Sequence, residues 1–260
     1  MLRGWQWVWL CGLLLTPSVY AHDSIREVAL AIGEFPPYTS ESLQHHGIAS
    51  QIVTEAFAQV DIEVTFAFFP WPRAYKQTQV MNNIWIGTFP WIWTPQRDDD
   101  FVFSDPIIES HDYLYFLDGD QESYPNMKAL EGTILGAPIH VSYPRLEQME
   151  AEQRLTIERV GTYEDLFERL LHRRIEVISL EEHVGRYLMQ ALLDGEEMTR
   201  IAQSRFPTEE RRYHLMISKR HPQSRLIVEK FNQGLEQLHR SGRYEEILNT
   251  LQLPDPDSGL

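Results

Sequence analysis

Residues 50–70, SQIVTEAFAQVDIEVTFAFFP, contain the pattern that decides the class of fold. In the first half of this stretch, apolar side chains recur at the three- and four-residue spacing of a helix with one buried face. From Ile62 to Phe68, apolar and polar residues alternate, which is typical of a strand. A helix followed directly by a strand predicts an α/β fold.

The same alternation extends in both directions from this stretch. Residues 26–32 alternate as a strand that ends at the turn-forming GEFPPY of 33–38, while a helix is expected over 72–81 and a strand over 84–89. The second half of the chain repeats the pattern, with strands expected at 133–137, 155–159 and 175–179 and helices at 144–152, 162–173 and 181–193. No internal sequence repeat accompanies it.

Two further strand-like segments predict how the halves connect. DYLYFL at 112–117 leads out of the first unit, and YHLMIS at 213–218 follows the second unit, which is expected to end near Pro207. The final helices, at 222–239 and 241–251, are assigned to the first unit. The chain is therefore predicted to form two lobes, joined by two crossings, around a cleft that closes by a hinge motion. The predicted lobes are residues 22–114 with 214–260, and residues 115–213.

Residues 94–106, TPQRDDDFVFSDP, place one arginine in a defined frame. Thr94 is a good N-cap, Pro95 suits the first helical position, and the acidic run that follows Arg97 favours a helix start. A short helical turn is expected there, followed by a strand that Ser104-Asp105-Pro106 ends. The planar guanidinium of Arg97 can then hold a carboxylate or phosphate through two parallel hydrogen bonds. The alternative is a surface ion pair with the neighbouring aspartates, which adds little stability.

The N-terminus has the pattern of a signal peptide. Arg3 is followed by an apolar run, 5–15, that is too short to span a bilayer, and Val19-Tyr20-Ala21 fits a cleavage site. We expect residues 1–21 to be removed, with an uncleaved membrane anchor as the alternative. The only cysteine, Cys11, lies in this segment. The mature chain is therefore expected to have no disulfide, thiol nucleophile or cysteine-based metal site.

Charge and motifs exclude several functions. The formal net charge of −15 argues against nucleic-acid binding, which depends on basic patches. It does not exclude a negatively charged ligand at a local arginine. The sequence has no HxxxH pair, GxSxG elbow or phosphate loop, so no metal site and no cofactor are expected.

The order and spacing of these segments resemble the bacterial extracellular solute-binding proteins of family 3, the periplasmic receptors that feed polar amino acids to ABC importers. The likeness rests on the leader, GEFPPY, the helix at 50–60, PWPRA at 70–74, TPQR with FVFSDP, and LEGTILGA at 130–137. It implies the two-lobed periplasmic-binding-protein fold of type II, with the ligand cleft between lobes joined by two hinge crossings. It also implies a monomer in the periplasm, with an inner-membrane ABC permease or a sensor protein as partner.

The resemblance also implies ligand-binding residues. Tyr38 matches the family's aromatic residue that covers the ligand, and Arg97 matches the arginine that holds the ligand α-carboxylate. Ser142 matches a hydroxyl position near a helix start that often meets the anionic end of the ligand. Glu181 stands where an aspartate usually receives the α-ammonium group; the alternative is that it stabilises the start of its helix.

Neighbouring positions extend this set or depart from the family pattern. Trp71 and Trp91, placed on turns by preceding prolines, are expected to extend the aromatic wall, with core packing as the alternative. Arg73 is expected to be a second anion contact. Ile92 replaces the Ser or Thr that often shares the carboxylate, and His140 replaces the family's usual glycine.

The expected function is therefore the binding of a small polar solute, an amino acid or a related zwitterion or organic acid, for ABC-type uptake by cleft closure. One alternative is an enzyme like the periplasmic cyclohexadienyl dehydratases, which would require burial to raise the pKa of Glu181 or Glu182. Another is an orphan module that binds a ligand and reports to a separate membrane protein.

Overall fold

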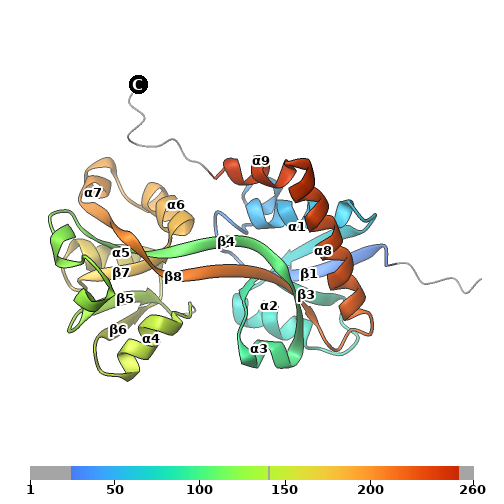
Figure 1. Cartoon of the computed structure of the whole chain (residues 1–260), viewed down its shortest axis with the longest axis horizontal. Helices are drawn as coiled ribbons and strands as arrows, with labels where there is room; N and C mark the ends of the chain where they lie inside the picture. Colours follow the sequence, from blue (N-terminus) through green and yellow to red (C-terminus); the bar gives the residue numbers. More distant parts are fainter. Residues whose placement is uncertain (1–24, 140, 252–260) are drawn as a thin grey trace, which may run out of the picture.

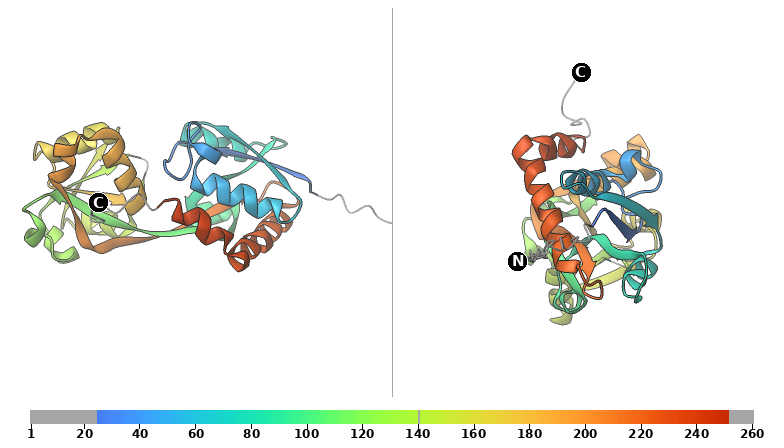
Figure 2. Two further views of the ribbon diagram at one scale, coloured as in Figure 1. Left: turned by 90° about the horizontal axis from the view of Figure 1, so that it is seen from above. Right: turned by 90° about the vertical axis from the view of Figure 1, so that its right-hand side faces the viewer.

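The computed structural model describes residues 25–139 and 141–251, and it divides into two lobes (Figure 1). Two long neighbouring strands, β4 (Phe101–Leu117) and β8 (Ile201–Ser218), run from one lobe into the other. The view from above shows the same two strands bridging the lobes (Figure 2). The predicted signal peptide, 1–21, and His140 lie outside the described residues. Among the described helices, none has the length and apolar character needed to cross a membrane.

The first lobe contains both ends of the described chain. Its strands are β1 (Glu27–Ile32), β2 (Glu63–Phe68) and β3 (Trp85–Ile92). Its helices are α1 (Ile48–Ala58), α2 (Trp71–Thr78), α3 (Pro95–Asp100), α8 (Ser224–Ser241) and α9 (Arg243–Asn249), with the 3-10 turn η1 (Gln44–His46). Helices α1 and α8 pack closely at Gly234, where a Cβ would lie only 1.8 Å from the carbonyl oxygen of Ala56.

The second lobe repeats the alternation of strands and helices. Its strands are β5 (Ile134–Pro138), β6 (Thr156–Val160) and β7 (Val177–Glu181). Its helices are α4 (Pro144–Ala151), α5 (Tyr163–Leu171), α6 (Glu182–Leu192) and α7 (Gly195–Thr199), with the 3-10 turns η2 (Gln121–Ser123) and η3 (Met127–Leu130). Apart from β4 and β8, which are longer than predicted, the predicted elements agree with the observed bounds to within a few residues. Among the described α-helices, only the short α7 was not anticipated.

One sheet joins the lobes, with the strand order β2-β1-β3-β8-β4-β7-β5-β6. In the first lobe β8 pairs with β3 over 213–217, and in the second lobe β4 pairs with β7 over 112–116. Between them, β4 and β8 pair with each other from Phe101 to Leu117. The predicted lobe boundaries, at 114/115 and 213/214, therefore fall inside the two long strands.

The expected end of a strand at Ser104-Asp105-Pro106 is wrong, because β4 continues through it. The register of β4 against β8 shifts on both sides of Pro106, and Pro207 lies within β8 at another irregular position, opposite Tyr113. Proline has no amide donor, but an irregular pairing does not require one at that residue. The irregular pairing at these two positions therefore allows β4 and β8 to continue past their prolines.

Candidate functional site

A cavity of about 530 Å³ lies between the lobes and is lined by residues from both. This volume is within the roughly 300–1,000 Å³ of typical small-molecule sites. Its lining residues lie at the carboxyl ends of parallel strands: Phe35 comes after β1, Ile92 ends β3, Ile139 comes after β5 and Thr162 after β6. Ligands of α/β proteins bind at this end of the strands. The fold therefore assigns the cavity as the candidate ligand site.

Arg97 lies on the first-lobe side of this cavity, as expected for the anion contact. The Thr94 hydroxyl accepts the Arg97 backbone N–H at 3.3 Å, which caps α3 and confirms the predicted helical turn. Nη1 of Arg97 donates to the carbonyl oxygen of Ile92 at 2.9 Å, and the guanidinium carbon lies 4.5 Å from the centre of the Trp91 ring. Position 92 thus contacts Arg97 through its backbone.

The guanidinium of Arg97 is half-buried and has no carboxylate partner among the described residues. The alternative of an ion pair with the neighbouring aspartates is therefore not what the structure shows. Burial lowers the pKa of Arg97, and the nearby Tyr75 opposes this shift. An arginine nevertheless stays protonated in proteins. The site contains an uncompensated positive charge.

Trp71 and Trp91 also line the cavity, and they contact each other edge to face with ring centres 5.3 Å apart. The indole N–H of Trp71 donates to the carbonyl oxygen of Glu34, and that of Trp91 donates to the Thr88 hydroxyl, each at 3.0 Å. Gly33 allows Trp71 to approach, because a Cβ there would lie 2.8 Å from the indole. With their polar atoms bonded internally, the two rings offer the cavity an apolar surface.

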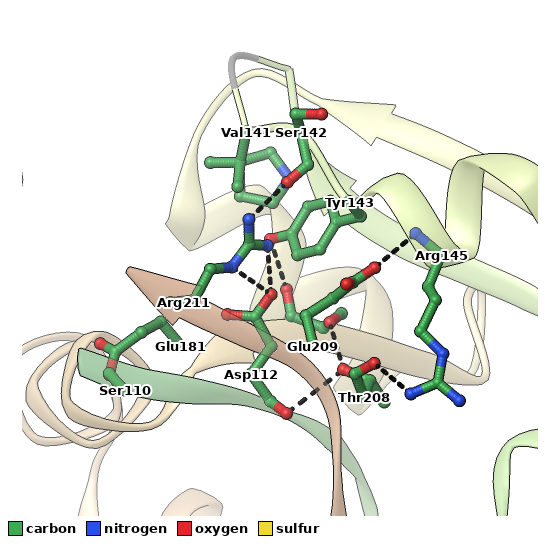
Figure 3. A network of polar contacts seen from close by, with 12 residues as sticks. Ser110, Asp112, Val141, Ser142, Tyr143, Arg145, Glu181, Thr208, Glu209 and Arg211 are labelled. Atoms are coloured by element: carbon green, nitrogen blue, oxygen red, sulfur yellow. Dashed lines mark hydrogen bonds and ion pairs between the residues drawn. The ribbon is translucent and has the colours of Figure 1, made fainter. Parts of the chain in front are cut away.

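Arg211, which the sequence analysis did not single out, lines the cavity. Its guanidinium lies between Asp112 and Ser142 (Figure 3). Its Nε donates to Asp112 Oδ2 at 2.8 Å, its Nη2 contacts the same oxygen, and its Nη1 donates to the Ser142 carbonyl at 2.7 Å. Arg211 and Asp112 have exposed fractions of only 3% and 1%. Burial raises the pKa of Asp112 to about 6, although Arg211 lowers it. The pair ties the crossing strands to the loop before α4.

Ser142 lines the cavity from the second lobe, but its hydroxyl donates to Glu147 Oε2 at 3.2 Å. Tyr213, Tyr75 and Tyr163 also line the cavity and were not anticipated. A signal for Tyr213 and Arg211 exists in the alternation of buried and exposed residues along ERRYHLMIS, which directs both side chains to the same face.

Tyr38 does not line the cavity. Its side chain is completely buried, and its ring contacts Phe35 and Tyr213, which do line it, at 5.6 and 5.7 Å between ring centres. The hydroxyl of Tyr38 lies 3.0 Å from Nδ1 of His183, at the start of α6. The structure therefore places Tyr38 behind the wall and in contact with the opposite lobe. That Tyr38 covers the ligand stays a prediction.

Glu181 is also absent from the residues that line the cavity. It is the N-cap of α6, and its carboxylate accepts the backbone N–H groups of His183 at 3.2 Å and Val184 at 2.9 Å and the hydroxyl of Ser110. Burial is the largest single influence and raises the pKa of Glu181. The hydrogen bond and charge of His183, with the hydrogen bonds from Ser110 and Val184, lower it by more, so the pKa of Glu181 is lowered. These contacts satisfy the carboxylate internally, which is the physical reason for its position.

Two remaining features lie outside the cavity lining. Arg73 is exposed on α2, with its guanidinium carbon 5.2 Å from the centre of the Phe69 ring, so the predicted second anion contact faces elsewhere. Glu181, Glu182 and His183 bring potential metal-ligand atoms within 4.8 Å of one another. Histidine spacing alone did not reveal this cluster. Its buried member, Glu181, already accepts three hydrogen bonds from protein groups.

Comparisons with known proteins agree with this architecture. The ligand-binding core of GluR0 from Nostoc punctiforme, solved with (L)-glutamate, has a TM-score of 0.68 at 16% identity, over 87% of this chain and 100% of that one. An arginine 3rd transport system periplasmic binding protein from Legionella pneumophila also has a TM-score of 0.68 at 16% identity, over 88% of this chain and 100% of that one. An ancestral amino-acid-binding protein, a precursor of cyclohexadienyl dehydratase, has a TM-score of 0.65 at 14% identity, over 86% and 94%.

These likenesses confirm the predicted two-lobed type II periplasmic-binding-protein fold. Comparison with curated proteins gives no match. The family model of the bacterial extracellular solute-binding proteins, family 3, matches residues 28–251. With both lobes and the crossing strands inside that match, the chain belongs to the bacterial extracellular solute-binding proteins, family 3.

Proposed function

We propose that the chain binds a small polar solute, an amino acid or a related zwitterion or organic acid, between its two lobes. The observation that carries this proposal is the half-buried, uncompensated guanidinium of Arg97 on an interlobe cavity. Membership of the family and the amino-acid-binding neighbours support the same class of ligand. The protein would act in the periplasm, after removal of residues 1–21, as a monomer.

The proposed mechanism is capture by closure. An anionic group of the solute accepts hydrogen bonds from Arg97, while Trp71 and Trp91 contact its body. Lining residues such as Ser142 and Tyr163 come from the other lobe, so a bound solute contacts both lobes and stabilises their closed arrangement. The crossing strands β4 and β8 would absorb the hinge motion. The closed form would then deliver the solute to an ABC permease or report to a sensor protein.

An enzymatic function of the dehydratase type is less well supported. That function needs a cleft carboxyl group whose pKa burial raises towards neutrality. Glu181 is buried, yet its internal hydrogen bonds and His183 lower its pKa. Glu181 is therefore held as a carboxylate. Burial does raise the pKa of Asp112 to about 6, but Asp112 is outside the cavity lining and bonded to Arg211. The carboxyl groups at the site therefore favour binding over catalysis.

Isothermal titration calorimetry of residues 22–260 with a panel of amino acids and organic acids tests the proposal. We expect at least one member to bind, and Arg97→Ala to weaken its affinity about 10- to 100-fold, because a hydrogen bond to a charged group contributes about 1.5–3 kcal/mol. Arg73→Ala is the matched control, since Arg73 lies outside the cavity lining. A panel without any ligand would contradict the proposed function, and full affinity in Arg97→Ala would remove Arg97 from the site.

A further inference from the structure

The charged side chains that line the cavity are mostly basic, although the chain carries a formal charge of −15. The described lining residues include Lys76, Arg97, Arg211 and one carboxylate, Glu34. Asp112 neutralises Arg211, while Lys76 and Glu34 are both exposed, where solvent and salt screen opposite charges. Arg97 is the half-buried charge that remains. The cavity therefore has about one uncompensated positive charge.

A zwitterionic amino acid would need a second partner, for its ammonium group, and the described residues offer it none that is free and buried. Glu181 is outside the lining and holds the start of α6, and Asp112 is bonded to Arg211. Glu34 is exposed, and its Oε1 accepts the backbone N–H of Glu41 at 2.8 Å. Burying an ammonium group without a paired charge is costly. The charge pattern therefore favours a ligand without that group.

The rest of the lining is unusually aromatic and offers hydrogen-bond donors. Six aromatic side chains face the cavity from both lobes and the crossing strand: Phe35, Trp71, Tyr75, Trp91, Tyr163 and Tyr213. The indole N–H groups are bonded internally, whereas the three tyrosine hydroxyls form no hydrogen bond with any described residue. Flat rings bind a planar apolar body, and free hydroxyls can donate to oxygen atoms on it.

We propose that the cavity takes a planar aromatic organic monoanion, such as an aryl-substituted carboxylate, in preference to a zwitterionic amino acid. This inference rests on the proposed function, because it specifies the ligand of the same cavity. Arg97 binds the carboxylate, Trp71 and Trp91 pack against the ring, and the tyrosine hydroxyls contact polar substituents. Selectivity against amino acids follows from the missing partner for the ammonium group.

Matched pairs of solutes test the inference by calorimetry on residues 22–260. Each pair differs only in the ammonium group: 3-phenylpropanoate with L-phenylalanine, and indole-3-propanoate with L-tryptophan. We expect each acid to bind at least about tenfold more tightly than its amino acid, since desolvating the unpaired ammonium group opposes binding. The uncharged 3-phenylpropanamide and the ring-free pentanoate should each bind more weakly than 3-phenylpropanoate.

Two matched pairs of variants assign the selectivity to named residues. Arg97→Gln should lower the affinity for 3-phenylpropanoate about tenfold or more and leave that for the amide unchanged, while Arg73→Gln should change neither. Trp71→Leu should lower the affinity for the aromatic acids but not that for pentanoate. Trp93 is 53% exposed and outside the cavity lining, so Trp93→Leu should change neither affinity. Thermal melts of each variant confirm folding, and the comparison of solutes on the unmodified chain needs no variant.

The outcomes separate this inference from the proposed function. If either amino acid, or an aliphatic one from the wider panel, binds as tightly as the aromatic acids or more so, the inference is overturned and solute binding stands. If no solute of either set binds, the proposed function fails and the inference fails with it.

Discussion

Two arginines at the boundary between the lobes have opposite surroundings. Arg211 is almost completely buried and bonded to Asp112, and its Nη1 donates to the Ser142 carbonyl. Arg97 is half-buried, and among the described residues the one hydrogen bond of its guanidinium is to the neutral carbonyl of Ile92. A buried charge is costly unless it is paired. The difference suggests that Arg211 has a structural role and that Arg97 is left for a charge that arrives with the ligand.

The carboxylates show the same distinction. Asp112 and Glu181 are both buried, and protein groups satisfy both: Arg211 in one case, and Ser110, His183 and the start of α6 in the other. Glu34, on the cavity, is exposed. Buried carboxylates with partners in the protein therefore hold the lobes and crossing strands together, whereas the carboxylate on the cavity does not.

The largest expected effect is on stability, in Asp112→Ala. This change leaves the Arg211 guanidinium buried without a counter-charge, which typically costs about 3–5 kcal/mol. Urea unfolding followed by circular dichroism measures the loss. Asp105→Ala is the control, because Asp105 is exposed on the same strand and should change the free energy of unfolding by less than about 0.5 kcal/mol. Equal stability of the two variants would show that Asp112 and Arg211 are not a structural pair.

A smaller, pH-dependent effect is expected for Glu181→Gln. The variant loses a carboxylate that accepts hydrogen bonds from Ser110 and the start of α6 and contacts His183, so we expect a loss of about 1.5–3 kcal/mol at pH 6. Burial lowers the pKa of His183, but the bond and charge of Glu181, together with the charge of Glu182, outweigh burial and the opposing charge of Arg186, so the pKa is raised. Unfolding curves over a range of pH measure the dependence.

The direction of this pH dependence follows from the two pKa shifts. Glu181 has a lowered pKa, so its contribution is present above its usual value of 4.5 and is lost as the pH falls through its folded pKa. His183 has a raised pKa, so its contribution is present below 6.5 and is lost as the pH rises through its folded pKa. The difference between the unmodified chain and Glu181→Gln should therefore be larger at pH 6 than at pH 9. A difference that grows at alkaline pH would contradict the Glu181–His183 pair.

Tyr38→Phe should have a smaller effect again. It removes the hydroxyl that lies 3.0 Å from His183 Nδ1 and keeps the buried ring, so we expect a loss of about 0.5–1.5 kcal/mol. Tyr75→Phe is the control from the cavity side, because the Tyr75 hydroxyl has no hydrogen-bond partner in the described part of the chain. Thermal unfolding compares the two. A greater loss of stability in Tyr75→Phe than in Tyr38→Phe would contradict the view that internally bonded groups stabilise the fold and cavity groups do not.

The sequence predicted the features that depend on neighbouring residues. The spacing in 50–70 predicted α1 and β2, and the Thr94-Pro95 pair predicted the capped turn that holds Arg97. The lengths of β4 and β8 were not predicted, because local rules treat Pro106 and Pro207 as strand ends, whereas the pairing of two distant segments carries each strand past its proline.

Side-chain surroundings were predictable only in part. Trp71, Trp91, Arg97 and Ser142, which the sequence analysis named, line the cavity, and their contact with a ligand stays a prediction. The resemblance did not indicate that Tyr38 and Glu181 contact His183. That arrangement brings together residues 145 positions apart in the chain. Arg211 was missed for the same reason, since its partner Asp112 lies on the other crossing strand.

The smallest expected change in stability is that of Arg97→Gln without ligand, and it tests the comparison between the two arginines most directly. No ion pair is lost, the hydrogen bond to Ile92 is to a neutral group, and a half-buried charge is removed, so the free energy of unfolding should stay within about 0.5 kcal/mol of the unmodified chain. A saturating solute should stabilise the unmodified chain and should stabilise the variant much less, because a ligand that binds the folded state adds stability according to its affinity. Thermal unfolding with and without solute measures both quantities. A large loss without ligand would show that Arg97, like Arg211, is structural, and would remove the uncompensated charge as evidence for an anionic ligand.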